Sequence, residues 1–237
     1  MPAVLYLDRY HLGDPLFLNG FARDVLAFPE PLVIVHGSGE AAERALEAQG
    51  RIAEWKDGVL AVETDADRAL VERAGRDLNR QIVHTLNDAG VAAVRLDAGS
   101  RGLLKATEKG VEAKKIDWLR TLVAQGAVPV ILAVLDAEGG PAREMNGGAV
   151  AGEIAASLSI KGESMPVLVM AKSGLKSLES HKSVILSELP DDVLSEPEAV
   201  QSALETGADV RLIARSDLRS GAVDGLALRS AVDKKSA

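Results

Sequence analysis

The sequence predicts an α/β protein with a largely parallel β-sheet. Apolar, strand-like runs alternate with segments whose apolar residues recur at helical spacing, an order typical of a parallel sheet covered by helices. The segment at residues 128–135 is apolar throughout, which favours a strand buried on both faces. With 237 residues, 47% of them hydrophobic, the chain can bury a large core as one domain or two lobes.

The strongest helical pattern lies between residues 66 and 89, and Gly90 supplies a stop. Apolar residues of this helix repeat every four positions: Leu70, Ala74, Leu78, Ile82 and Leu86. Strands are expected, in chain order, at residues 3–7, 32–35, 59–62, 91–96, 128–135, 166–170 and, last, 210–214. The other helices are expected at residues 15–28, 41–49, 117–125, 147–160 and 198–206.

The second strand ends in a glycine-rich turn, His36-Gly37-Ser38-Gly39. Because glycines lack a Cβ, several backbone N–H groups can converge on an anion at such a turn. We expect the turn to contact a small anionic ligand, and we expect His36 to orient the turn itself by hydrogen bonding.

Composition excludes several classes of function. The chain has no cysteine, so disulfides, thiolate metal sites and cysteine nucleophiles are excluded. Its four histidines never approach metal-ligand spacing, and we predict no metal site. The net charge of −8 comes without a basic stripe, which argues against nucleic acid as a partner. Neither a membrane-spanning apolar run nor a secretory signal is visible, so we expect a cytoplasmic protein with no membrane partner.

Five segments resemble, in the same order, those of the amino acid kinase superfamily, and specifically the acetylglutamate kinase group. VIVHGSGE is similar to the family's Val-Val-Val-His-Gly-Gly-Gly-Pro, and LNRQIVHTLNDAG to its Val-Asn-X-X-Leu-Val-X-X-Leu-Asn-X-X-Gly helix. EMNGGAVAGEIAASL resembles the Asn-Val-Asn-Ala-Asp-Thr-X-Ala-X-X-Ile-Ala-X-X-Leu helix. GAVPVILAVLDAEGG and ALETGADVRLIA resemble the strand and turn before that helix and the late helix-to-strand passage.

The resemblance implies a three-layer αβα sandwich with a mainly parallel sheet, the amino acid kinase (carbamate kinase-like) fold. It divides the single domain into a substrate and dimerisation lobe at residues 1–160 and a reduced nucleotide lobe at residues 161–237. It also implies an ATP- and Mg-dependent phosphotransferase with a carboxyl acceptor, working in arginine or lysine biosynthesis. The helix matching residues 78–90 lies at a two-fold interface in the family, so we expect a homodimer.

The chain departs from the family where the phosphoryl group is held. The first strand of the family ends in a Lys and a Gly-Gly turn, whereas this chain has LYLDRYHLGD, in which Asp8 would repel phosphate. Arg9 is the only cation near this position. We favour the simpler interpretation that it is a solvated residue at the end of the strand, and we keep it as a weak catalytic candidate. Ser38 replaces the middle glycine of the turn. The Gly-Gly-Met-X-X-Lys segment that brings the second lysine is replaced by the acidic DDVLSEPEA.

Further departures concern the substrate. Asn146 matches the second family Asn, but Glu144 stands for the first, and Gly148 stands for the Asp that orders the two lysines. The carboxylate-anchoring motif Gly-X-Arg-X-Thr-Asp appears as GVLAVETD, with Thr64 and Asp65 retained and the Arg lost. The resemblance thus implies Gly37, Ser38, Gly39, Thr64, Asp65 and Asn146 as substrate-binding residues. The small residues after Asn146 either face an anion from a helix N-terminus or permit close packing, and the sequence leaves both open.

A cationic turn follows the strand at residues 166–170, where MAKSGL replaces the family's Leu-Thr-Asp-X-X-Gly. Lys172, Gly174 and Lys176 are weak candidates for nucleotide contacts, and Lys172 is also a weak catalytic candidate. A solvated cationic loop is the more common outcome for such a sequence.

Two functions follow. The first is a pseudoenzyme that has lost phosphoryl transfer and serves as a small-molecule binder, a regulator or a partner of a true family kinase, without a cofactor. The second is an active kinase that uses ATP and Mg to form an acyl phosphate, with Arg9, Lys172 and Lys176 as substitutes. Residues 37–42 also fit a Gly-X-Gly-X-X-Ala dinucleotide fingerprint, but its acidic residue would be Glu54, outside any strand pattern, and this alternative ranks lower.

Overall fold

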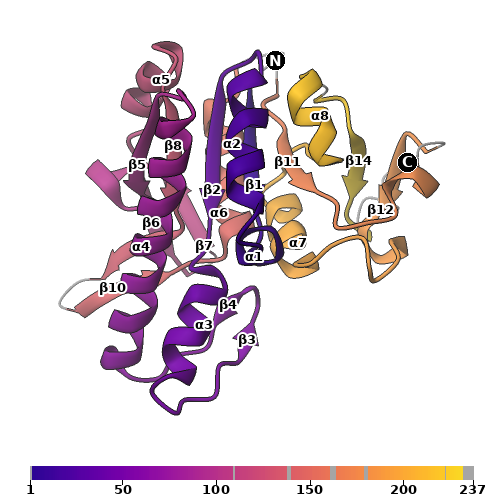
Figure 1. The fold of residues 1–237 in the computed structure, drawn as a ribbon. Coiled ribbons are helices and arrows are strands. Elements are labelled where there is room, and N and C mark those ends of the chain that lie inside the picture. The colour runs from indigo at the N-terminus through magenta and orange to yellow at the C-terminus, as the bar shows by residue number, and fades with distance from the viewer. Residues whose placement is uncertain are drawn as a thin grey trace.

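A computed structural model describes residues 2–108, 110–137, 140–160, 164–178, 181–221 and 223–231. Its centre is an eight-stranded sheet in the order β12-β14-β13-β11-β1-β2-β8-β5 (Figure 1). The strands from β13 to β5 run parallel, while β14 pairs antiparallel with β13, and β12 runs parallel to β14. The strand bounds are β1 Ala3–Leu7, β2 Leu32–His36, β5 Ala93–Asp97, β8 Val128–Leu132, β11 Val167–Met170, β12 Ser183–Ile185, β13 Val210–Ile213 and β14 Leu226–Arg229.

Helices cover both faces of the sheet. Side chains of a strand alternate between the two faces, so a strand that is apolar throughout needs a helix layer on each side. In β1, Leu5 packs into the core beneath α2, α4 and α8, whereas Val4 and Tyr6 pack into the core beneath α5, α6 and α7. The first group of helices comprises α2 Phe17–Ala27, α4 Asp65–Asp88 and α8 Arg215–Ser220. The second comprises α5 Asp117–Ala124, α6 Gly147–Leu158 and α7 Pro197–Glu205.

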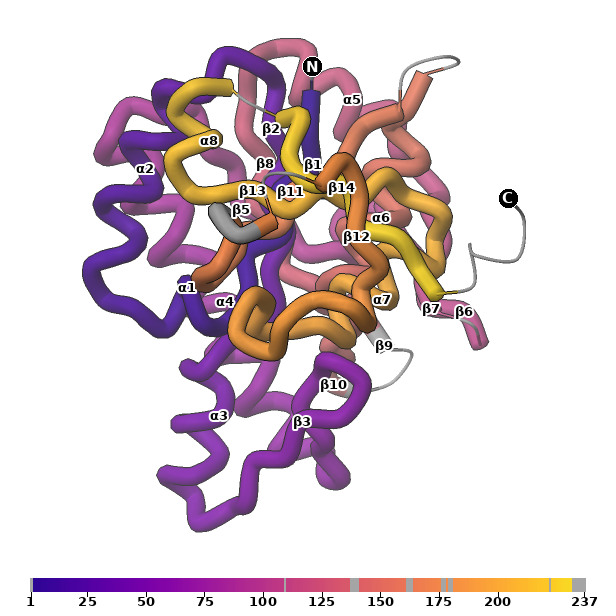
Figure 2. Tube along the Cα trace, turned by 90° about the vertical axis from the view of Figure 1, so that its right-hand side faces the viewer, coloured from indigo at the N-terminus to yellow at the C-terminus, as the bar shows by residue number. Residues whose placement is uncertain are grey.

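The segments beyond the carboxyl ends of β1 and β2 are short helices and hairpins. The helix α1 Arg9–Gly13 follows β1, and α3 Gly39–Glu47 follows β2. Three hairpins are formed by β3 Trp55–Lys56 with β4 Val59–Leu60, β6 Leu104–Thr107 with β7 Gly110–Ala113, and β9 Val134–Ala137 with β10 Gly140–Glu144. Figure 2 shows α3 and β3 at the end of the molecule opposite the N-terminus. Open α/β sheets bind ligands outside the carboxyl ends of their strands, so a ligand site is expected at this end.

The apolar stripe of α4 packs inside this chain. Leu78, Ile82 and Leu86 are 8%, 0% and 1% exposed, and all three join the core that contains β1 and β2. The outer face of α4 instead carries charged side chains such as Arg73, Asp77 and Arg80. Among the described helices, including this one, none combines the length and apolarity needed to cross a membrane.

The three-layer αβα sandwich and the mainly parallel sheet are confirmed. Two predicted strands need correction. The apolar run at 128–135 is divided at Ala133, because β9 leaves the sheet to pair with β10. The strand at 210–214 was wrongly expected to be the last, because α8 and β14 follow it. The division into two lobes stays a prediction, since one sheet runs through both segments.

Candidate functional site

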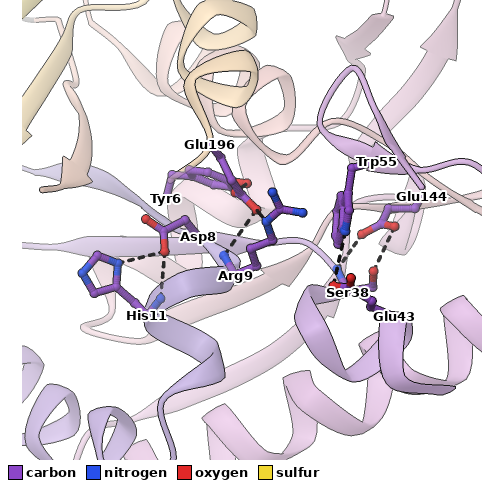
Figure 3. A network of polar contacts seen from close by, with 9 residues as sticks. All are labelled: Tyr6, Asp8, Arg9, His11, Ser38, Glu43, Trp55, Glu144 and Glu196. Atoms are coloured by element: carbon purple, nitrogen blue, oxygen red, sulfur yellow. Dashed lines mark hydrogen bonds and ion pairs between the residues drawn. The ribbon is translucent and has the colours of Figure 1, made fainter. Parts of the chain in front are cut away.

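The glycine-rich turn after β2 already holds a carboxylate of this chain. The Ser38 N–H donates to Oε1 of Glu144 at 2.5 Å, and the Ser38 hydroxyl donates to Oε2 at 2.9 Å (Figure 3). A Cβ built on Gly37 would lie 3.0 Å from the same Oε1, so the glycine allows the carboxylate to approach the backbone. Glu144 ends β10, and the β9–β10 hairpin therefore delivers it to the turn. An anion-binding turn is thus occupied by an internal anion.

The Glu144 carboxyl is partly screened from solvent, and burial raises its pKa. Hydrogen bonds from the Ser38 amide, the Ser38 hydroxyl and the Leu60 amide act in the opposite direction, because they favour the charged form. The Leu60 contact comes from the β3–β4 hairpin, so Glu144 joins the turn to this hairpin.

A second carboxyl, that of Glu196, lies at the other side of the site, in the loop before α7. Tyr6 donates its hydroxyl hydrogen to Oε2 of Glu196 at 2.5 Å. The Arg9 Nε lies 3.5 Å from Oε1, and the Arg9 guanidinium carbon lies 4.3 Å from the centre of the Trp55 ring. The site's cation is therefore held between an internal carboxylate and an aromatic ring.

Burial raises the pKa of Glu196 to about 7, and the nearby charge of Asp8 acts in the same direction. Tyr6 and Arg9 oppose that shift by stabilising the carboxylate. The pKa of the Tyr6 hydroxyl lies well above its usual value, chiefly because the group is buried and secondly because of the Glu196 charge.

Asp8 caps the first turn of α1. Its Oδ1 accepts hydrogen bonds from the His11 N–H at 2.9 Å and from the His11 Nδ1 at 2.8 Å. Both residues are buried, at 3% and 8% exposure. Asp8, which the resemblance puts at or beside the family's first lysine, therefore serves here as an N-cap.

These side chains leave almost no space between them. A cavity of about 10 Å³ remains, bounded by Tyr6, Arg9, Leu12, Gly37, Gly39, Trp55, Gly58, Glu144 and Glu196. That volume is about one water molecule. Its lining contains two carboxyl groups and one guanidinium group.

Close packing explains the small residues at the start of α6. A Cβ on Gly148 would lie 1.7 Å from the carbonyl oxygen of Ala199 in α7, and a Cβ on Gly147 would lie 2.5 Å from the Tyr6 ring. Asn146 caps the helix through its Oδ1, 3.1 Å from the Ala149 nitrogen. The sequence left open whether these small residues face an anion or permit close packing. The geometry favours close packing, because the neighbouring groups already fill the space over the first turn.

Comparison with known proteins agrees with this fold. No family model matches the chain. An acetylglutamate kinase of Geotalea uraniireducens is 30% identical over 214 residues, which cover 79% of this chain and 72% of that protein. The chain belongs to the acetylglutamate kinase family. A kinase of the same name from Chloroflexus aurantiacus is 30% identical over 66% of each chain, and one from Trichodesmium erythraeum is 32% identical over 53% of this chain and 46% of its own length. The match thus spans about half to two thirds of these last two relatives.

Solved structures support the amino acid kinase fold. N-acetylglutamate synthase from Neisseria gonorrhoeae, solved with coenzyme A and N-acetyl-glutamate, superposes with a TM-score of 0.69 at 19% identity, covering 97% of this chain and 59% of that one. An isopentenyl phosphate kinase superposes with a TM-score of 0.61 at 16% identity, covering 97% and 99%. At these identities the likeness concerns the fold alone.

The other substrate-binding residues that the family resemblance implied lie in two places. Asn146 contacts the β3–β4 hairpin, because its Nδ2 donates to the carbonyl of Asp57 at 2.7 Å. Thr64 and Asp65 lie away from the cavity: Thr64 caps α4 by accepting from the Asp67 N–H at 3.1 Å, and Asp65 pairs with Arg68.

Of the predicted nucleotide contacts, Lys172 lies at a separate groove of about 840 Å³. Lys172 lines this groove, and its Nζ lies 5.0 Å from the centre of the Tyr10 ring. Gly174 occupies a left-handed turn with φ +71°, whereas the Lys176 side chain lies outside the described residues. Four acidic residues line the same groove: Asp57, Asp191, Glu198 and Glu205.

The residues present do not fit ATP and Mg²⁺. The resemblance puts the family's organising Asp at Gly148, where the Ala199 carbonyl leaves no room for a side chain. The groove at Lys172 offers four carboxylates against one described ammonium, and carboxylates raise the energy of a polyphosphate by Coulomb repulsion. Among the described residues, no group of three or more potential ligands is arranged to hold a metal ion.

Sequence reasoning missed Tyr6 and Trp55 as parts of the site. Tyr6 lies in a strand that is buried at every position, and Trp55 begins a two-residue strand, so neither carries a local signal. Glu144 and Glu196 were visible only as acidic replacements, and their convergence on one cavity depends on the tertiary fold.

Proposed function

We propose that this chain is a non-catalytic member of the acetylglutamate kinase family, retained as a small-molecule-binding or regulatory protein. The observation that carries the proposal is the Glu144 carboxylate, which takes the Ser38 amide and hydroxyl at 2.5 and 2.9 Å. A substrate carboxylate or a phosphoryl group would have to displace this internal ligand and would then meet a negatively charged site.

Electrostatics supports the loss of catalysis. Phosphoryl transfer depends on positioning and on cancelling the charge that develops on the transferred group. Loss of one such stabilising group typically costs about 3 kcal/mol of transition-state stabilisation. Here Asp8 stands near the first lysine position, Gly148 at the Asp position, and the only described cation lining the cavity, Arg9, is bound to Glu196.

An active kinase with relocated cations is the competing function. It would need Arg9 to leave Glu196 and Trp55, and Lys172 to leave the face of the Tyr10 ring. It would also need α7 to withdraw from Gly148. No contact among the described residues favours such a rearrangement.

The family relation suggests the setting. We place the chain in the cytoplasm, beside an active family kinase of arginine or lysine biosynthesis, either as a homodimer or paired with that kinase. Because the apolar stripe of α4 is buried in its own core, an interface on this helix would use its charged outer face. Light scattering tests the homodimer: a mass near the 24.9 kDa of one chain rejects it.

Hydroxylamine trapping tests the loss of catalysis. The purified chain is incubated with N-acetylglutamate, ATP and Mg²⁺, and any acyl phosphate is captured as the coloured hydroxamate. The acetylglutamate kinase of Geotalea uraniireducens serves as the positive control. We expect no product above the enzyme-free background. Turnover that survives repurification and is abolished by Arg9→Gln would overturn the proposal.

A further inference from the structure

The groove beside Lys172 is bounded by one face of α7. Glu198, Gln201, Ser202 and Glu205 all line it, and their spacing of three and four positions puts them on the same side of a helix. The Gln201 Nε2 donates to Oε1 of Glu205 at 2.9 Å, so both of these side chains lie along this face. The groove measures about 840 Å³, within the range of about 300–1,000 Å³ that is typical of small-molecule sites.

The charge around this groove is negative and largely uncompensated. Against one described ammonium, that of Lys172, stand four exposed acidic residues: Asp57, Asp191, Glu198 and Glu205. The carboxylates of Asp57, Asp191 and Glu198 have no ion-pair or hydrogen-bond partner among the described residues. A bound cation would therefore gain Coulomb energy here without first displacing an internal partner of these three carboxylates.

The rest of the lining indicates an organic cation. Much of it is apolar, and comes from Leu186, Leu189, Pro190, Leu194 and Pro197. Such a surface suits the methylene groups of an alkylammonium ion better than a hydrated metal ion. Ser195 lines the same groove, and its hydroxyl oxygen is buried without a hydrogen-bond partner among the described residues. An ammonium group carries only donors, so it can use this vacant acceptor.

We propose that this groove binds a linear aliphatic polyamine, with ammonium groups on Glu198 and Glu205 and methylene groups against the apolar lining. Glu205 follows Glu198 by seven positions, which is about 10 Å along the helix axis. An extended polyamine places two ammonium groups at such a separation, whereas a short diamine reaches only one of the two carboxylates. The inference deepens the proposed function and rests on it, because it requires that ATP does not occupy the same groove.

Calorimetric titration at low ionic strength tests this binding with three probes. Spermidine and 1,8-diaminooctane have terminal ammonium groups that are equally far apart along the chain, and we expect both to bind. The third probe, 1,4-diaminobutane, carries the same two charges as 1,8-diaminooctane at a shorter separation. It should bind at least about 10-fold more weakly, because it cannot engage both carboxylates at once.

Two variants and a matched control identify the site. Glu198→Gln combined with Glu205→Gln should weaken spermidine binding by about 10-fold, since each exposed ion pair contributes little alone. Ser202→Lys, which places an ammonium between these two carboxylates on the same helix face, should abolish it. Glu47→Gln is the control, because Glu47 is an exposed glutamate of α3 that does not line this groove. It should leave the affinity unchanged, and thermal melts should show all variants folded.

Three results overturn the inference: no heat with spermidine at millimolar concentration, equal affinity for the two diamines, or unaltered affinity in the double glutamine variant. The hydroxamate assay is read separately. Its product overturns the proposed function, whereas absence of product together with absence of spermidine binding overturns this inference alone.

Discussion

Replacing Glu196 with Gln should stabilise the protein at alkaline pH. The Glu196 carboxyl is 7% exposed, lies beside Asp8, and has a pKa raised to about 7 by burial. A glutamine keeps the acceptor for the Tyr6 hydroxyl, now 2.5 Å away, while removing the charge that burial disfavours. The variant therefore isolates the cost of holding an ionised Glu196 in the closed site.

The magnitude follows from linkage. The folded pKa of about 7 lies above the ordinary value of 4.5, so the folded state binds the proton more tightly. The stabilisation from that proton is complete below about pH 4.5 and is lost as pH rises through 7. At about 1.4 kcal/mol for each pKa unit, the ionised group costs roughly 3 kcal/mol at pH 8. Glu196→Gln should recover up to that amount at pH 8 and almost none at pH 4.5.

Urea unfolding between pH 4.5 and 8 provides the assay. The quantity to follow is the difference in the free energy of unfolding between the variant and the wild type. The difference is needed because His36, whose pKa burial lowers to about 4, contributes the opposite slope: its stabilisation is lost as pH falls from 6.5 toward 4. Glu198→Gln, at an exposed position in the first turn of α7, is the matched control. A difference for Glu196→Gln that is flat across this range would refute the reasoning.

Two further predictions concern the internal contacts of the site. Glu144→Ala should lower the free energy of unfolding by about 1–3 kcal/mol, because the Ser38 and Leu60 amides lose their acceptor. Added formate should raise the melting temperature of this variant more than that of wild type, and equal shifts would contradict an anion site at the turn. Gly148→Ala should cost about 3 kcal/mol or more in urea unfolding, since its Cβ would lie 1.7 Å from the Ala199 carbonyl oxygen. A cost below about 1 kcal/mol would contradict this prediction, because it would show that α7 can move away from the added methyl group.

Much of the fold could be predicted because periodicity reports burial. The helix expected at 66–89 is observed at Asp65–Asp88, and the strand at 3–7 is observed unchanged. The strand expected at 59–62 overlaps β4, but its partner β3 was missed because β3 and β4 have two residues each, too few to show a period of two. The run at 128–135 was read as one strand because both of its halves are apolar, although they pair with different partners.

The site was less predictable, since its contacts join distant parts of the chain. Sequence alone identified the glycine-rich turn and the acidic replacement at Glu144, but not that the second binds the first across 106 positions. Glu196 lies 190 positions from Tyr6, and their hydrogen bond depends on the packing of α7 against α6 and of α6 against β1. Thr64 and Asp65 match a family motif, yet in the structure Thr64 is the N-cap of α4 and Asp65 lies in the first turn of that helix.

Ligand-induced thermal stabilisation tests the central claim most directly. The chain is melted with and without ATP–Mg²⁺ and N-acetylglutamate, each at millimolar concentration. A ligand present at 100 times its dissociation constant adds about 2.7 kcal/mol of stability, which corresponds to a shift on the order of 5–10 °C for a chain of this size. With Glu144 holding the turn and the remaining cavity at about 10 Å³, we predict no shift with either ligand. A shift of several degrees with both would contradict the account.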